Sequence, residues 1–366
     1  MSALHRVALT FLRNIGPSLG RALITYFGDA QSVFEAPAAK LLKVPGVGER
    51  TVRSLNFDDA LRRAEAELKF VEENNINILF FTDSTYPKRL KNCPDAPVLL
   101  YARGNANLNA KYVVSIVGTR NATEYGKALC RQLIEELSGY GVLVVSGLAF
   151  GIDVMAHKEC LKHGVPTVGV VGHGLDRIYP SQNKGTAEKM LENGGLLSEY
   201  PSGTIPDREK FPQRNRVVAG LADATIVVEA GIKGGALITA EIANSYNRDV
   251  FAFPGRLGDE YSEGCNFLIR NNKAQLLTCA ADLPYSLGWD NQETAKPPTE
   301  QILLPLNLLP DEILIFNHIR ESNGPLAIDD LSVRTNMPTS KLAMSLLNME
   351  IQGYIRSLPG KTYCIN

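Results

Sequence analysis

Glycines, hydroxyl groups and basic side chains follow the apolar runs in the middle of this chain. The run 112–117 leads directly into a glycine, a threonine and an arginine, and later runs lead into further glycines and cations. Arginine can bind a phosphate through two parallel hydrogen bonds, and hydroxyl and turn N–H groups can add others. These residue types therefore indicate an anion-binding site. The candidate residues are Gly118, Thr119, Arg120, Lys184, Arg214, Asn215, Arg216 and Lys233.

Each of these cations, taken alone, is explained equally well by a salt bridge to a carboxylate such as Glu229 or Asp176. Taken together, they favour an anionic ligand, because scattered structural turns would show no common bias toward glycines and cations. Aromatic residues occur in the same segments, and nucleic-acid bases stack on such rings, although core packing is their commoner role. The aromatic residues are Phe150, Tyr179, Tyr200 and Phe211.

No catalytic, metal or cofactor motif accompanies these residues. The chain has neither G-x-S-x-G nor G-x-x-x-x-G-K-[ST], and "GHGLDR" has Arg177 where a dinucleotide-binding motif needs its last glycine. The six cysteines include no C-x-x-C pair, and the five histidines form no ligand pair with them. The strand-end carboxylates include no marked acid–base pair. We therefore expect no catalytic residue, no metal and no cofactor, and hence no enzyme.

Apolar runs rich in β-formers alternate with stretches of helical period through the middle of the chain. This repetition predicts an α/β fold, a mostly parallel sheet with helices on both faces. Parallel strands end at one edge of their sheet, so the candidate residues are expected to line a crevice there. The predicted strands span 112–118, 141–147, 165–172, 194–200, 223–231 and 249–255, and the predicted helices span 124–140, 153–164, 183–194 and 236–247.

Composition shifts divide the chain into four segments. Residues 1–66 predict short helices, and "VPGVGER" within them resembles a helix-hairpin-helix turn, either a tight turn or a backbone phosphate site. Residues 67–288 contain the α/β pattern. The prolines and mixed polarity of residues 289–309 are typical of a linker. Residues 310–366 predict three helices and a hairpin, which is a winged-helix pattern.

Bulk composition excludes several classes of protein. The 366 residues are 45% hydrophobic and 21% charged with a net charge of −1, so a uniformly basic DNA-coating protein is excluded. No apolar run approaches the roughly 20 residues of a membrane helix, and the first residues lack a signal-peptide pattern. Scattered single cysteines are typical of reduced thiols, so we expect a cytoplasmic protein without membrane contact.

Several segments, in this order, resemble the DNA-processing protein A family, also called DprA or Smf. The segments are "SIVGTRNATEYG", "VVSGLAFGIDVMAH", "GLDRIYPSQNK", "LLSEYPSGTIPDREKFPQRNRVVAGLADATIVVEAGIKGGALITAEIA" and "DVFAFPG". They cover nearly all of 67–288. The helical segment before them and the winged helix after them resemble the flanking domains of that family. The resemblance implies a Rossmann-like domain that binds single-stranded DNA without catalysis.

The resemblance also implies a biological role and assigns roles to residues. Members act in natural transformation, where a homodimer protects incoming single strands, binds the RecA recombinase and loads it onto them. The phosphate-binding turn of the family corresponds to Gly118–Arg120, its basic residue to Lys184, and its Arg-Asn-Arg motif to 214–216. Its dimer contact corresponds to Ile269 and Leu276.

The chain departs from the family pattern at three places. Thr119 replaces a serine and keeps the hydroxyl, and Gly234 replaces a serine. The stretch "NNKA" stands where the family has glycine-alanine and carries an extra residue, so the sequence leaves the register of the dimer contact open.

Two other functions fit parts of the sequence. The "KGGALITAE" loop is similar to that of nucleotide hydrolases of the lysine-decarboxylase-like group, in which Glu241 would be the catalytic residue. A winged-helix transcription factor is the other alternative. However, residues 301–366 carry five Lys or Arg against six Asp or Glu, and the third helix offers only Lys341. We therefore predict that the winged helix contacts protein rather than DNA.

Overall fold

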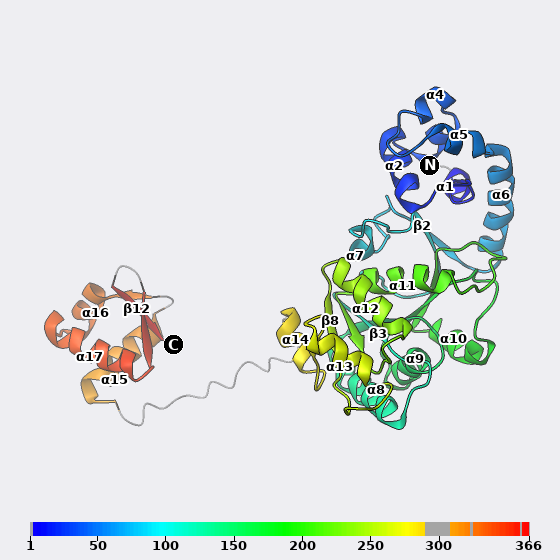
Figure 1. Cartoon of the computed structure of the whole chain (residues 1–366). Coiled ribbons are helices and arrows are strands. Elements are labelled where there is room, and N and C mark those ends of the chain that lie inside the picture. Colours follow the sequence, from blue (N-terminus) through cyan, green and yellow to red (C-terminus); the bar gives the residue numbers. More distant parts are fainter. Residues whose placement is uncertain (1–2, 290–307, 323–324, 359–360, 366) are drawn as a thin grey trace. The chain divides into compact units, whose positions relative to one another are not determined.

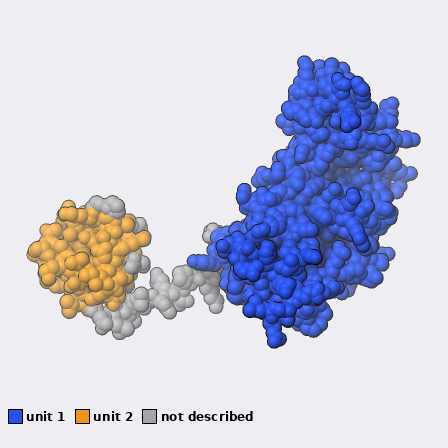
Figure 2. Space-filling model, in the orientation of Figure 1, with its two compact units in different colours: residues 1–291 blue, residues 292–366 orange. Residues whose placement is uncertain are grey.

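The computed structural model describes residues 3–289, 308–322, 325–358 and 361–365. The chain divides into two compact units, residues 1–291 and 292–366, which Figure 2 shows in two colours. Most of the predicted linker, residues 290–307, lies outside the described residues.

Short helices form the N-terminal part of the first unit. They are α1 (Ala3–Leu9), α2 (Pro17–Phe27), α3 (Ala30–Phe34), α4 (Ala38–Leu41), α5 (Glu49–Ser54) and α6 (Phe57–Glu73). Helix α6 passes through the boundary predicted at residue 66, because its apolar face continues to Val71, which is buried. The predicted glycine turn lies between α4 and α5. There Gly46 has φ +85°, a conformation that favours glycine.

A nine-stranded sheet follows, in the order β1-β2-β6-β5-β4-β3-β7-β8-β9. Its strands are β1 (Asn77–Phe80), β2 (Leu99–Gly104), β3 (Tyr112–Val117), β4 (Val142–Ser146), β5 (Thr167–Val171), β6 (Gly194–Ser198), β7 (Ala224–Val227), β8 (Asp249–Ala252) and β9 (Gln275–Leu276). The pairs β1–β2 and β2–β6 are antiparallel, and all other pairs are parallel.

Helices cover both faces of this sheet (Figure 1). Helices α8 and α9 pack on one face, and α11 and α12 pack on the other. The helices of this region are α7 (Lys88–Lys91), α8 (Glu124–Leu137), α9 (Ile152–His163), α10 (Lys184–Met190), α11 (Lys210–Leu221), α12 (Gly235–Ser245), α13 (Glu263–Arg270) and α14 (Asp282–Leu287), with short 3-10 helices at Ser138–Tyr140 and Ser181–Asn183.

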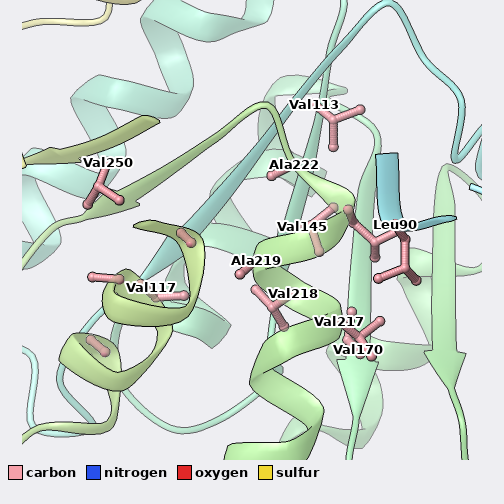
Figure 3. Close-up of a cluster of buried hydrophobic side chains, with 14 of the residues drawn as sticks. Leu90, Val113, Val117, Val145, Val170, Val217, Val218, Ala219, Ala222 and Val250 are labelled. Carbon is pink, nitrogen blue, oxygen red and sulfur yellow. The ribbon is translucent and has the colours of Figure 1, made fainter. Parts of the chain in front are cut away.

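The alternation of side chains along β3 explains why one strand serves two cores. Val113 and Val117 face the core that includes α11, whereas Val114 and Ile116 face the core that includes α8. Figure 3 shows the first of these cores, where Val217 and Val218 of α11 lie among residues from α7 and the sheet. Each fully buried valine contributes about 1.5–3 kcal/mol to folding, so the sequence "RVVAGL" fixes α11 firmly over the sheet.

The connections reverse direction beside β3. From β3 the chain moves through β4 and β5 to β6, and then it returns to place β7 on the other side of β3. Loops leaving β3 and β7 therefore diverge to opposite faces of the sheet and leave a crevice at its carboxyl edge. This is the edge where the sequence analysis placed the candidate residues.

The second unit is a winged helix. It contains α15 (Pro310–Glu321), β10 (Leu326–Ala327), α16 (Ile328–Thr335), α17 (Thr339–Ile351), β11 (Ile355–Leu358) and β12 (Thr362–Ile365). Its three strands form a sheet in the order β10-β12-β11, and the helices pack around Ile315, Leu331 and Leu346. The predicted fold class is thus confirmed: a mostly parallel α/β sheet with a helical region before it and a winged helix after it. Among the described residues, no helix has the length and hydrophobicity needed to cross a bilayer.

Candidate nucleic-acid interface

The turn after β3 is held from both sides by backbone hydrogen bonds. Thr119 N donates to Glu229 O at 2.7 Å, and Thr119 O accepts from Ile152 N at 3.1 Å. A β-carbon on Gly118 would lie 2.5 Å from Ile152 Cγ1, so the turn packs too closely for a side chain there. The turn is therefore preorganised, with its hydroxyl and guanidinium projecting from a fixed backbone.

Glu229 also anchors the start of α8. Its carboxylate accepts hydrogen bonds from Thr123 N and Thr123 Oγ1, and Thr123 is the N-cap residue of α8. A β-carbon on Gly126 would lie 2.0 Å from Glu229 Oε2, so this glycine makes room for the buried carboxylate. Glu229 thus joins the loop after β7 to the turn after β3 and to the start of α8. Among the described residues, its carboxylate forms no ion pair with the nearby cations.

Arg120 is exposed at the end of this turn and lies over an aromatic ring. Its guanidinium carbon is 5.5 Å from the ring centroid of Phe211, and Phe211 in turn stacks on Tyr179 at 6.1 Å. Within the described parts of the chain, Arg120 has no carboxylate within ion-pair distance. Its charge is therefore available to a ligand, and the two rings beside it offer a surface on which bases can stack.

Residues 210–221 form helix α11, a segment for which the sequence analysis predicted neither a helix nor a strand. The residues "VVAGL" pack against the sheet as part of this helix, and the basic motif at 214–216 lies in the turns before them. Residues two apart on a helix project about 200° apart, so Arg214 and Arg216 face different surroundings. Proximity in sequence does not make these two arginines neighbours in one site.

Arg214 is buried beneath the crevice with 5% of its surface exposed. Its Nη1 donates to Val170 O at 2.7 Å, and a β-carbon on Gly147 would lie 1.8 Å from Nη1. Asp153 is buried nearby, and its Oδ2 accepts from Gly147 N at 3.2 Å. Burial lowers the pKa of Arg214 and the charge of Asp153 raises it, whereas burial raises the pKa of Asp153 and the charge of Arg214 lowers it. Arg214 therefore supports the loops from below.

Arg216 lies on another side of α11, where it pairs with Glu199 and donates to Asp95 O. Only 12% of the Arg216 side chain is exposed, so these contacts occupy much of its guanidinium. Tyr246 donates to Asp95 Oδ1, which extends the network to the end of α12. The predicted DNA contact of Arg216 stays a prediction, and the observed contacts are structural.

A cavity of about 530 Å³ opens between the turns at the carboxyl ends of β3, β4 and β7 and the exposed side of α11. It contains three of the candidate residues from the β3 turn and two from the Arg-Asn-Arg motif. Its lining is Val117, Gly118, Thr119, Arg120, Gly147, Ala149, Asp153, Arg208, Phe211, Pro212, Arg214, Asn215, Val218, Gly234, Gly235, Ala236, Ile238 and Thr239. The sequence analysis did not single out Arg208, whose only signal was its position in the segment after the fourth strand.

The remaining candidates lie outside this lining. Lys233 is exposed just before the two glycines that begin α12. Lys184 is exposed at the start of α10, next to Asn183, whose side chain donates to Leu148 O and so ties this segment to the β4 loop. Their roles in DNA binding stay predictions. Ile269 is half-buried on α13 and Leu276 is exposed on the edge strand β9, and the dimer contact likewise stays a prediction.

The buried titratable groups around the cavity are not arranged as an acid–base pair. Burial lowers the pKa of His157 to about 3, and its Nδ1 is hydrogen-bonded to Thr167 Oγ1 at 2.7 Å. His157 is therefore uncharged at neutral pH and lies within the core. Glu241, the catalytic residue of the hydrolase alternative, lies outside the lining, and Lys273 Nζ donates to it at 2.5 Å.

Comparisons with known proteins agree on one family. A family model described as DNA recombination-mediator protein A matches residues 77–288, and one described as the DprA winged helix domain matches 296–361. Protein Smf of Synechocystis is 32% identical over an alignment of 392 positions, which covers 98% of this chain and 97% of the relative. The DNA processing protein DprA of Streptococcus pneumoniae is 41% identical over 201 residues, covering 55% and 71%.

Two solved structures extend the similarity to three dimensions. The crystal structure of DprA from Streptococcus pneumoniae aligns with a TM-score of 0.67 and 32% identity, covering 78% of this chain and 98% of the other. A structure of DNA processing protein A from Helicobacter pylori aligns with a TM-score of 0.53 and 32% identity, covering 58% and 95%. The latter is described as revealing a single-stranded DNA binding mode of the Helicobacter protein.

Proposed function

This chain belongs to the DNA recombination-mediator protein A (DprA/Smf) family of DNA-processing proteins, and from that premise we propose that it binds single-stranded DNA in the cavity at the carboxyl edge of its sheet. The observation that carries the proposal is Arg120, an exposed cation on a rigid glycine turn, placed directly over the ring of Phe211. In one nucleotide, the phosphate can bind the Arg120 cation and the base can stack on an aromatic ring beside it.

The geometry favours single strands over duplex. Stacking on Phe211 or Tyr179 requires an exposed face of a base, and within a duplex both faces of each internal base are covered by its neighbours. The cavity is also a recess, lined by loops and by the first turns of α11 and α12, and a recess of this kind receives separate bases rather than the groove of a duplex. Phosphate contacts at Arg120 and Arg208 carry no sequence information, so little sequence preference is expected.

The family resemblance supports the biological role that we propose. The protein protects incoming single strands during natural transformation, binds the RecA recombinase and loads it onto those strands, and works as a homodimer that includes Ile269 and Leu276. It acts without catalysis. No structural observation favours the alternative nucleotide hydrolase, because Glu241 pairs with Lys273 away from the cavity.

Binding of fluorescent single strands and duplexes of equal length tests the proposal. We expect the single strand to bind more tightly, and Phe211→Ala to weaken that binding by about 1–3 kcal/mol, the usual loss of one stacked base. Phe27, a half-buried residue of α2 whose ring lies against Tyr26, provides a matched Phe→Ala control away from the cavity. A nucleotide-hydrolysis assay and a RecA-loading assay run in parallel. Equal affinity for duplex, or turnover of nucleotide, would refute the proposal.

A further inference from the structure

A second cavity, of about 500 Å³, lies on the other side of α11, where the N-terminal helices meet the sheet. Much of its wall is apolar and comes from α1, the segment before α2, and the start of β2. The lining is Leu9, Thr10, Ile15, Gly16, Pro17, Gly20, Asp95, Pro97, Val98, Leu99, Glu199, Tyr200, Pro201, Gln213 and Arg216. None of these residues was assigned to the first cavity.

The two cavities share the first turns of one helix. Phe211 and Pro212 line the first cavity, and Gln213, the next residue, lines the second. An α-helix with its side chains is about 10 Å across, so a strand that leaves Phe211 reaches the second cavity by crossing one helix. Lys210 stands at this crossing, with its Nζ 5.9 Å from the ring centroid of Tyr200.

Two of the three charged side chains that line the second cavity pair with each other. Arg216 pairs with Glu199, and the Asp95 carboxylate accepts a hydrogen bond from the Tyr246 hydroxyl. An occupant with a full charge would disturb these buried pairs, whereas an uncharged ring would not. Near the opening, Tyr200 donates its hydroxyl proton to Gln213 Oε1 at 3.0 Å, which leaves the amide N–H groups of Gln213 for acceptors on a ligand.

Apolar walls, an arginine already paired with Glu199 and a rim of amide donors match an uncharged, planar group with acceptor atoms at its edge. Because the two cavities lie on either side of the first turns of α11, we propose that this one is a second base-binding subsite for the same single strand. One unstacked base enters it, and the phosphate before that base passes over α11 beside Lys210. This inference rests on the proposed function of the first cavity.

Filling the second cavity tests the inference. Thr10→Phe places a ring into the cavity, and Ser18→Phe is the matched control, because Ser18 is exposed on α2 next to the cavity but outside its lining. Gln213→Leu is a second variant that removes the amide donors with little change of volume. Affinity of the full chain is measured for oligothymidylates of increasing length by fluorescence anisotropy.

We expect the affinity of wild-type protein to rise once the strand is long enough to reach both cavities. Thr10→Phe and Gln213→Leu then lose that increase, roughly tenfold or about 1.4 kcal/mol, while the affinity for the shortest strand that binds and the behaviour of Ser18→Phe are unchanged.

Other outcomes would overturn the inference in distinguishable ways. If the folded variants keep the full dependence on length, the second cavity holds no base. If they lose affinity equally for short and long strands, α11 has shifted and the residues are structural. If wild-type protein binds no single strand at all, the proposed function fails together with the subsite.

Discussion

Replacing Arg214 with methionine isolates the electrostatic role of a buried cation. Methionine retains much of the length and apolar character of the side chain but removes the hydrogen bond to Val170 O and the charge near Asp153. A buried hydrogen bond from a charged group contributes about 1.5–3 kcal/mol. Each unit by which the pKa of Asp153 then rises adds about 1.4 kcal/mol to the loss of stability at a pH where its carboxylate is ionised. We expect a total loss of about 3 kcal/mol in the free energy of unfolding at neutral pH.

The loss of stability caused by Arg214→Met should become larger as the pH is raised. Burial raises the pKa of Asp153 above its unfolded value, and the Arg214 charge opposes that shift. A carboxyl group with a raised folded pKa stabilises the fold below its unfolded pKa, and this contribution is lost as pH rises through the folded pKa. Removing Arg214 raises the folded pKa further, so the variant should lose more stability than wild type as the pH is raised.

Urea unfolding of Arg214→Met and wild type, at about pH 5 and about pH 8, measures this difference. The destabilisation should be larger at the higher pH. In an Asp153→Asn background, Arg214→Met should cost the same at both pH values, because the titrating group is gone. Arg208→Met is the matched control: Arg208 lines the same cavity but is exposed, so its loss should weaken DNA binding and leave stability within about 0.5 kcal/mol.

Three results would refute this reasoning. A destabilisation that is equal at both pH values would mean that the Asp153 carboxylate does not respond to the Arg214 charge. Strictly additive losses in the double variant would lead to the same conclusion. If Arg214→Met instead unfolds no more easily than Arg208→Met, then Arg214 is a ligand contact and not a support for the loops.

Three further predictions concern binding and assembly. Arg120→Ala should weaken binding of single strands and flatten the slope of log K against log salt by roughly 0.7. Lys189 is an exposed lysine on α10, and Lys189→Ala should change neither the affinity nor the slope. Weaker binding of Arg120→Ala with an unchanged slope would point to a structural role. Ile269→Asp should convert a homodimer into folded monomers in sedimentation experiments, and a monomeric wild-type protein at micromolar concentration contradicts this. Deleting residues 301–366 should change single-strand affinity by no more than about threefold, a difference of under 1 kcal/mol in binding free energy, because that segment is net acidic. A hundredfold loss of affinity would identify the winged helix as a principal DNA-binding surface.

The sequence by itself determined the fold class and the edge of the sheet at which the candidate residues lie. Alternation of apolar runs and helical stretches specifies a parallel sheet, and parallel strands share a carboxyl edge, so Gly118 and Arg120 had to lie there. The order of motifs was sufficient to identify the family. These inferences succeed because they depend on period and chain direction, which are local properties of the sequence.

The tertiary structure decided which candidate residues share a cavity. The motif at 214–216 lies within helix α11, and the valines that follow it are packed in the core against the sheet. The helical twist then sends Arg214 beneath the crevice and Arg216 to Glu199. Helix α11 thereby separates two cavities, one lined by Phe211 and the other by Gln213. No sequence pattern specifies this arrangement, since it depends on contacts between segments far apart in the chain, and only packing selects which side of a helix meets which neighbour.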